Sequence, residues 1–198
     1  MAQSGVNLAG LIGSRICHDL ISPVGAITNG LELLEMTGAV QGPEMDLISD
    51  SVNCAEARIK FFRIAYGAAG EQKIGRAEVA SIFDDLNRGN RIRAEWCPVE
   101  PVLRSETRLA FLALQCCETA MPVGGEVKIE ETSANWRVTG TASRLAVDPS
   151  LWEGLSNPAA LVQITPAQVQ FALLPAVAAD TGRRITVETT ESQVIIRF

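Results

Sequence analysis

Histidine is almost absent from this sequence, and cysteine occurs in no paired motif. The only histidine is His18, and the five cysteines form no CxxC pair. Structural zinc sites need about four cysteine or histidine ligands at characteristic spacings, so no zinc site is expected. Unpaired cysteines are typical of buried, reduced thiols in a cytosolic protein. We therefore expect a cytoplasmic protein that holds no metal ion of its own.

Positive charge is also in short supply. The chain has 17 lysines and arginines against 23 aspartates and glutamates, which gives a formal net charge of −6. The basic residues are scattered along the sequence and form no cluster with aromatic residues. Proteins that bind nucleic acids usually carry a basic patch, so we do not expect nucleic acid as the main partner.

No stretch of the sequence is typical of a membrane span. Residues 154–179 carry no charge, but they include Asn157, three glutamines and three prolines. This composition predicts a buried helix with a lead-in loop. Asn7 and several glycines interrupt the apolar N-terminus, so we expect neither a signal peptide nor an association with a membrane.

The sequence does contain a long apolar stripe near its N-terminus. Apolar residues recur every three or four positions, which is the period of an α-helix. Pro23 lies inside the stripe and leaves one helical carbonyl without its usual partner. We predict one helix over roughly residues 6–37, bent near Pro23; two shorter helices that meet there are the alternative. The stripe comprises Ile12, Ile16, Leu20, Val24, Ile27, Leu31 and Leu34.

His18 lies on the opposite face of this predicted helix. At about 100° per residue, its face also carries Ser22, Gly25 and Asn29, with Arg15 one turn before it. Small and polar neighbours leave room for another protein to approach. An ordinary surface histidine is the alternative interpretation of this residue.

A second amphipathic helix is expected after Gly42-Pro43, because proline is favoured in the first helical turn. Its apolar rows are Ile48, Val52, Ala55, Ile59, Phe62 and Tyr66, flanked by Leu47, Cys54 and Phe61. Two antiparallel helices cannot bury such wide faces alone. We predict that residues 1–68 form a homodimeric four-helix bundle, with packing onto the rest of the chain as the competing use of these faces.

The second half of the chain has a mixed helix and strand pattern. Residues 67–70 are a natural linker, and a second domain is expected over residues 72–198. Together these parts predict an α+β fold in which helices cover one face of a mostly antiparallel sheet. The expected helices cover 78–87, 105–120 and 166–180, and the expected strands cover 91–96, 126–131, 135–141, 184–189 and 193–198.

Residues 18–24, His-Asp-Leu-Ile-Ser-Pro-Val, resemble the phosphoacceptor motif of sensor histidine kinases. The two N-terminal helices resemble the dimerisation and histidine phosphotransfer domain of these kinases. The second half resembles their ATP-binding domain, a Bergerat-type α/β sandwich. The turn Gly124-Gly125-Glu126-Val127 matches the kinase pattern after the first nucleotide-binding motif.

The nucleotide-binding residues of the kinases are nevertheless missing. The asparagines of the first motif are replaced by Gln115 and Thr119, residues 138–144 contain no acid, and residues 168–173 contain no glycine. Without these groups the nucleotide loses its Mg²⁺ ligands and its phosphate cradle. An intact phosphoacceptor motif beside a degenerate ATP site resembles the ChpT-type histidine phosphotransferases of alphaproteobacteria.

This resemblance implies a phosphorelay without ATP. A receiver domain of a hybrid histidine kinase would donate a phosphoryl group to His18, and the receiver of a response regulator would accept it. Mg²⁺ would be bound by the receiver, and this chain would bind no cofactor. Asp19 is expected to act as a base or to hydrogen-bond the imidazole, Ser22 and Asn29 to orient groups, and Arg15 to balance phosphate charge. An active autokinase and a non-catalytic dimeric scaffold are the alternatives.

Overall fold

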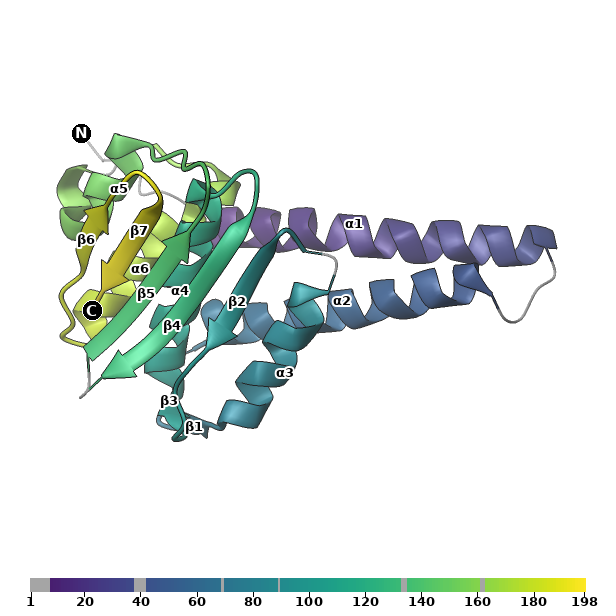
Figure 1. Cartoon of the computed structure of the whole chain (residues 1–198), viewed down its shortest axis with the longest axis horizontal. Coiled ribbons are helices and arrows are strands. Elements are labelled where there is room, and N and C mark those ends of the chain that lie inside the picture. Colours follow the sequence, from purple (N-terminus) through teal and green to yellow (C-terminus); the bar gives the residue numbers. More distant parts are fainter. Residues whose placement is uncertain (1–7, 38–41, 69, 89, 133–134, 161–162) are drawn as a thin grey trace.

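The computed structural model describes residues 8–37, 42–68, 70–88, 90–132, 135–160 and 163–198 (Figure 1). An antiparallel hairpin of α1 (Leu8–Thr37) and α2 (Pro43–Ala65) projects from the rest of the molecule. Helix α1 runs unbroken through Pro23, which confirms one helix instead of two. Helix α2 begins at Pro43, as expected.

The two helices of the hairpin approach closely at Gly30. Gly30 is buried, and a Cβ atom at this position would lie 2.5 Å from Cγ1 of Ile48. Only glycine therefore fits this contact without moving the facing isoleucine. The contact also fixes which residues of α1 face which residues of α2.

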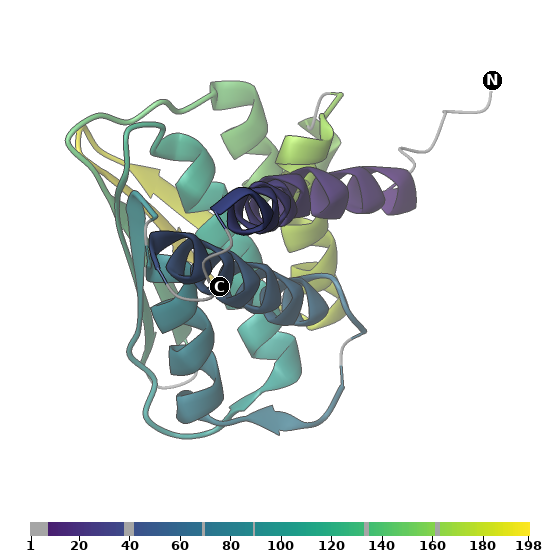
Figure 2. The same ribbon diagram turned by 90° about the vertical axis from the view of Figure 1, so that its right-hand side faces the viewer.

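The rest of the chain forms a five-stranded sheet in the order β2-β4-β5-β7-β6. Strands β2 and β4 are parallel and the other neighbours are antiparallel. Helices cover one face of the sheet (Figure 2), which confirms the α+β class. The strands are β2 (Ile92–Trp96), β4 (Gly125–Thr132), β5 (Asn135–Thr141), β6 (Thr186–Thr189) and β7 (Gln193–Arg197), and the helices are α3 (Arg76–Asn87), α4 (Arg104–Ala120), α5 (Pro149–Ser156) and α6 (Val169–Asp180).

Several elements were not expected from the sequence. The short strands β1 (Lys73–Ile74) and β3 (Val102–Leu103) pair with each other, and α5 precedes the 3₁₀ turn Pro158–Ala160. Helix α5 is capped by Asp148, whose carboxylate accepts a hydrogen bond from the backbone N–H of Ser150 at 3.0 Å. The expected helix over 166–180 begins as a 3₁₀ turn, Pro166–Gln168, and continues as α6. No helix among the described ranges is long and apolar enough to cross a membrane.

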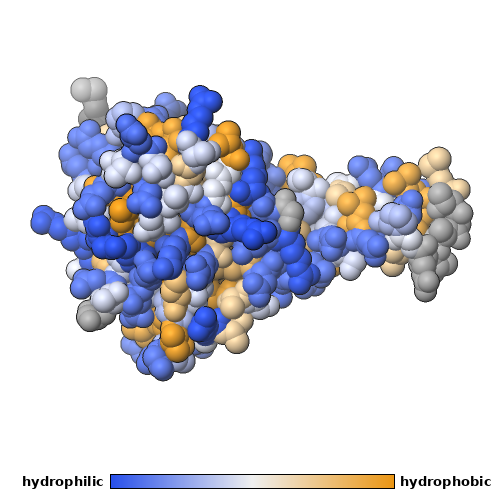
Figure 3. All heavy atoms as spheres, viewed as in Figure 1, coloured by the Kyte–Doolittle hydropathy of each residue, from blue (hydrophilic) through white to orange (hydrophobic). Residues whose placement is uncertain are grey.

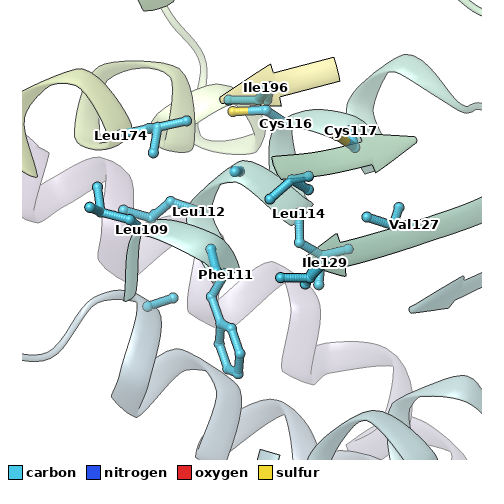
Figure 4. Packing of buried hydrophobic residues seen from close by; sticks show 14 of the residues in the cluster. Leu109, Phe111, Leu112, Leu114, Cys116, Cys117, Val127, Ile129, Leu174 and Ile196 are labelled. Carbon is cyan, nitrogen blue, oxygen red and sulfur yellow. The ribbon is translucent and has the colours of Figure 1, made fainter. Parts of the chain in front are cut away.

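Helix α4 lies at the centre of the hydrophobic core. Its side chains pack between the sheet, represented by Val127 and Ile129, and Leu174 of α6 (Figure 4). Cys116 and Cys117 are fully buried on α4, and their burial raises the pKa of both thiols. Cys116 and Cys117 agree with the expectation of buried, unpaired thiols, whereas that expectation was wrong for Cys17, which is exposed, and Cys54 and Cys97 are only partly buried.

The apolar surface of the hairpin is buried at one end and exposed at the other. Near the sheet domain, Phe61 stacks on Phe111 with ring centroids 4.5 Å apart, and Phe62 and Ile64 are buried in the same core. This end of the hairpin therefore packs onto the rest of the chain, which is the alternative that the sequence analysis left open. Further out, apolar side chains stay at the surface (Figure 3): Val24, Leu31, Met36, Met45, Leu47 and Val52.

Replacing Phe61 with alanine should lower the free energy of unfolding by about 3–5 kcal/mol, the usual cost of removing a buried phenyl ring. The reason is the loss of the stacked contact that joins α2 to α4. Its exposed neighbour Lys60 is the control, because Lys60→Ala should change stability by less than about 0.5 kcal/mol. Denaturant unfolding of both variants measures the difference, and equal stabilities would show that this end of α2 is not part of the core.

Candidate functional site

His18 projects from the middle of α1 into solvent. Its side chain is 83% exposed, as the polar face of the predicted helix required. The Nδ1 atom lies 3.1 Å from Oδ1 of Asp19, which is the next residue. A carboxylate can only accept a hydrogen bond, so this contact favours the tautomer with its proton on Nδ1. The Nε2 atom is then the ring nitrogen that carries the free lone pair.

Asp19 is held on its other side by two guanidinium groups. Its side chain is only 11% exposed, and Oδ2 lies 2.7 Å from Nε of Arg15, four residues earlier on α1. Nη1 of Arg58 on α2 approaches the same oxygen at 4.0 Å. The carboxylate thus bridges an exposed imidazole and a partly buried pair of arginines.

Arg15 also joins α1 to the sheet domain. Its Nη1 donates a hydrogen bond of 2.7 Å to the carbonyl oxygen of Ala167, in the turn before α6. The same carbonyl accepts a hydrogen bond of 3.0 Å from Nε2 of Gln170. One side chain therefore contacts both the acid beside His18 and the backbone of the second domain.

The residues that replace the nucleotide-binding motifs bond to one another. Nε2 of the fully buried Gln170 lies 2.8 Å from Oγ1 of Thr119. The Tyr66 hydroxyl donates to Oε1 of Gln115 at 3.1 Å, and burial raises the pKa of Tyr66 to about 12. These side chains fill the interface between the helices with their own hydrogen bonds.

A small cavity of about 60 Å³ lies where α1, α2, α3 and α4 meet. Charged side chains from three of these helices line it: Arg15 and Asp19 from α1, Arg58 from α2 and Glu118 from α4. Burial raises the pKa of the half-buried Glu118 to about 7, although Arg15 and Arg58 act in the opposite direction. Two acidic and two basic side chains therefore line one space that includes Asp19, the neighbour of His18.

The structure unites some of the residues expected at the site and separates others. Arg15 and Asp19 are bonded to each other, and Asp19 contacts His18. Ser22 is exposed one turn further along α1 and borders a separate hollow with Cys54 of α2. Asn29 is eleven residues from His18, roughly 16 Å along the helix axis. No hydrogen bond described in the structure joins Ser22 or Asn29 to His18.

Arg58 and Glu118 are site residues that the sequence analysis missed. Both are single charged residues in long helices, and nothing local distinguishes them from a solvated face. A partial signal for Arg58 exists in the hairpin register, because Asp19 is eleven residues before Gly30 and Ile59, the neighbour of Arg58, is eleven residues after Ile48, which faces Gly30. Glu118 has no such signal, because only the packing of α4 against the hairpin brings it here.

The described ranges hold no group of three or more histidine, cysteine, aspartate or glutamate side chains that could bind a metal ion. The charged cluster at the cavity contains only two carboxylates, and two guanidinium groups oppose them. Its chemistry therefore suits hydrogen bonding and charge balance.

Comparison with known proteins places this geometry in a family. A model of the histidine phosphotransferase C-terminal domain matches residues 76–193. The protein phosphotransferase ChpT of Brucella abortus (strain 2308) is 33% identical over 199 residues, which cover 97% of this chain and 95% of that protein. The chain belongs to the ChpT-type histidine phosphotransferases. It is thus a protein phosphotransferase of two-component phosphorelay signalling.

One solved structure shows the same overall arrangement over the whole chain. A bacterial phosphotransferase solved at 1.7 Å is 29% identical, with a TM-score of 0.77 over 100% of this chain and 98% of that chain. A more distant overlap is with the histidine kinase ThkA, which was crystallised with the response regulator protein TrrA. It is 18% identical, with a TM-score of 0.47 over 98% of this chain and 61% of that chain.

We expect the neutral ring of His18 to carry its proton mainly on Nδ1, because Asp19 offers an acceptor there. Nitrogen-15 NMR reads this directly, since the chain has one histidine. An Asp19→Ala variant should lose the preference, whereas Asp84→Ala, which removes an exposed acid of α3, should keep it. A wild-type ring protonated mainly on Nε2 would contradict the geometry.

Proposed function

We propose that this phosphotransferase passes a phosphoryl group between the aspartates of two receiver domains through Nε2 of His18. The observation that carries this proposal is the orientation of the ring, with Nδ1 on Asp19 and the rest of the side chain in solvent. The donor is the receiver of a hybrid histidine kinase, and the acceptor is the receiver of a response regulator. Ile21, one turn from His18 and 69% exposed, offers an apolar contact to either receiver.

In the first step, the lone pair of Nε2 attacks the phosphorus of the donor's aspartyl phosphate. A phosphorus–nitrogen bond forms while the phosphorus–oxygen bond to the aspartate breaks, and the donor leaves as a carboxylate. The phosphorylated ring retains its proton on Nδ1 and becomes cationic, which the carboxylate of Asp19 stabilises. In the second step, the acceptor's aspartate attacks the same phosphorus and the neutral imidazole leaves.

Other groups near the site have supporting roles in this proposal. Arg15 holds Asp19 in place, and its charge also helps to balance that of the incoming phosphoryl group. Ser22 is exposed on the same side of α1 and would orient a phosphate oxygen or the docked receiver, and Asn29 would contact the receiver further along the helix. Mg²⁺ arrives with the receiver.

The proposal also holds that this chain does not use ATP. Its support is the replacement of the nucleotide-binding residues by side chains that form hydrogen bonds within the protein, Gln170 to Thr119, and Gln115 to Tyr66 of the hairpin. In this arrangement Arg15 of α1 is hydrogen-bonded to the turn before α6. The second domain thereby supports α1 instead of delivering a nucleotide to it.

We further propose that the chain is a homodimer through the outer part of the hairpin. Leu31 and Met36 on α1 are 51% and 83% exposed, and Leu47 and Val52 on α2 are also exposed. Isolated exposed apolar residues are common, but contiguous patches mark interfaces. A second copy of the hairpin would cover this patch as a four-helix bundle.

Removing the imidazole should abolish transfer. In His18→Ala and His18→Gln, label from a phosphorylated receiver should not reach the protein, while the fold and dimer persist because the side chain makes little packing contact. Cys17→Ala, a change at the exposed neighbouring residue, should leave acceptance unchanged. Quenched reactions with radiolabelled receiver measure both, and label on His18→Ala would refute the assignment.

The mass in solution should be that of two subunits of 21.2 kDa at micromolar concentration. Leu31→Asp should give a monomer, because the dimer would bury an unpaired charge, which costs several kcal/mol. Glu32→Gln, at the exposed neighbouring position, should remain a dimer. Light scattering with size exclusion tests this, and a wild-type mass of one subunit would contradict the dimer.

A further inference from the structure

The cavity between the hairpin and α4 contains two charged residues that the transfer steps above do not use, Arg58 and Glu118. Glu118 is supplied by α4, the helix that corresponds to the first nucleotide-binding motif of the kinases, and it faces Arg15, Asp19 and Arg58. It lies behind Asp19 as seen from the exposed imidazole, since Asp19 contributes to both places. Glu118 is therefore placed to influence the site without touching a phosphoryl group or a receiver.

We propose that Glu118 is a positioning residue for phosphoryl transfer, which acts through Arg15 and Arg58 on Asp19 and so on the Nδ1 atom of His18. This inference rests on the proposed role of His18 as the phosphoacceptor. It assigns the second domain a direct electrostatic part in the reaction. The contribution comes from the helix whose nucleotide ligands have been replaced.

Arg58 supplies the first argument, because its guanidinium group is incompletely paired. Nη1 is 4.0 Å from Oδ2 of Asp19, and the buried Nε has no hydrogen-bond partner among the described residues. An arginine with a free buried donor can respond to the charge on either side of it. Glu118 lines the same cavity, and its attraction competes with that of Asp19.

The charge balance of the cluster supplies the second argument. When Glu118 is ionised, two carboxylates face two guanidinium groups, and Asp19 can share its lone pairs with His18. When Glu118 is neutral, Asp19 alone faces both arginines. The carboxylate is then drawn toward them and becomes a weaker acceptor for the Nδ1 proton. An ionised Glu118 therefore favours the cationic ring that forms during transfer.

The groups around Glu118 come from every helix at the cavity. Helix α1 contributes Arg15 and Asp19, and α2 contributes Arg58. Tyr66, which follows α2, interacts electrostatically with Glu118, and its hydroxyl is protonated because its pKa is raised to about 12. Helix α3 contributes Asn87, which is uncharged. Since the pKa of Glu118 is raised to about 7 by burial, the acid is mostly neutral at pH 6 and mostly ionised at pH 8.

The test is the rate of His18 phosphorylation by a phosphorylated receiver between pH 6 and pH 8, in wild type and Glu118→Gln. The wild-type rate should exceed the variant rate several-fold at pH 8, and the two should converge at pH 6, where Glu118 is neutral in both. Effects of pH on the receiver are common to both proteins and cancel in the ratio. The difference should appear in the rate at saturating receiver, with the half-saturating concentration unchanged.

Matched variants separate the possible explanations. Glu118→Asp keeps the charge, so its transfer rate should depend on pH as the wild-type rate does. Glu131→Gln, which changes an exposed acid of β4, should also behave as wild type. If Glu118→Gln does not fold by circular dichroism, Glu118→Ala gives the same comparison. A ratio that stays constant from pH 6 to pH 8 would overturn the positioning role. Label on His18→Ala would instead overturn the proposed function beneath it.

Discussion

Arg15 binds two partners at once, and the rest of the site depends on this double contact. One nitrogen holds the carboxylate beside His18, and another holds the Ala167 carbonyl of the second domain. A lysine could not make both contacts, because it lacks the fixed fork of the guanidinium group. Helix α1 and the sheet domain are therefore joined at Asp19, the acid that contacts the imidazole, so a movement between the two parts changes the surroundings of His18.

The hairpin satisfies two constraints along one pair of helices. At its inner end, Phe61 and Phe62 belong to the core around α4, which fixes the hairpin to the sheet domain. At its outer end, Leu31 and Leu47 remain exposed. His18 lies between the two ends, on the face of α1 that neither use requires. Because the apolar faces point away from His18 at both ends, wide apolar faces on both helices are compatible with the exposure of His18.

Much of this architecture follows from patterns within single segments, and the remainder depends on contacts between segments. The spacing of apolar residues by three and four positions predicted that α1 continues through Pro23, and the alternation of residues predicted the strands of the sheet. Helix α5 was missed although Asp148-Pro149 is an ordinary helix start, because its eight residues lie beside a long uncharged stretch. The exposure of His18 follows from periodicity. Glu118 could not be found in this way, since its position depends on how α4 packs against the hairpin.

A relay intermediate must both accept and release its phosphoryl group, and the charged cluster is suited to that balance. A proton kept on Nδ1 makes the phosphorylated ring cationic, and a cationic ring is the better leaving group for the second transfer. The same proton does not block the attack in the first step, because the attacking lone pair is on Nε2. In the proposed mechanism, Asp19 stabilises the cation only while its carboxylate is not fully engaged by Arg15 and Arg58. Glu118, the second acid at the cavity, would therefore act on the cationic ring that forms as His18 accepts the phosphoryl group.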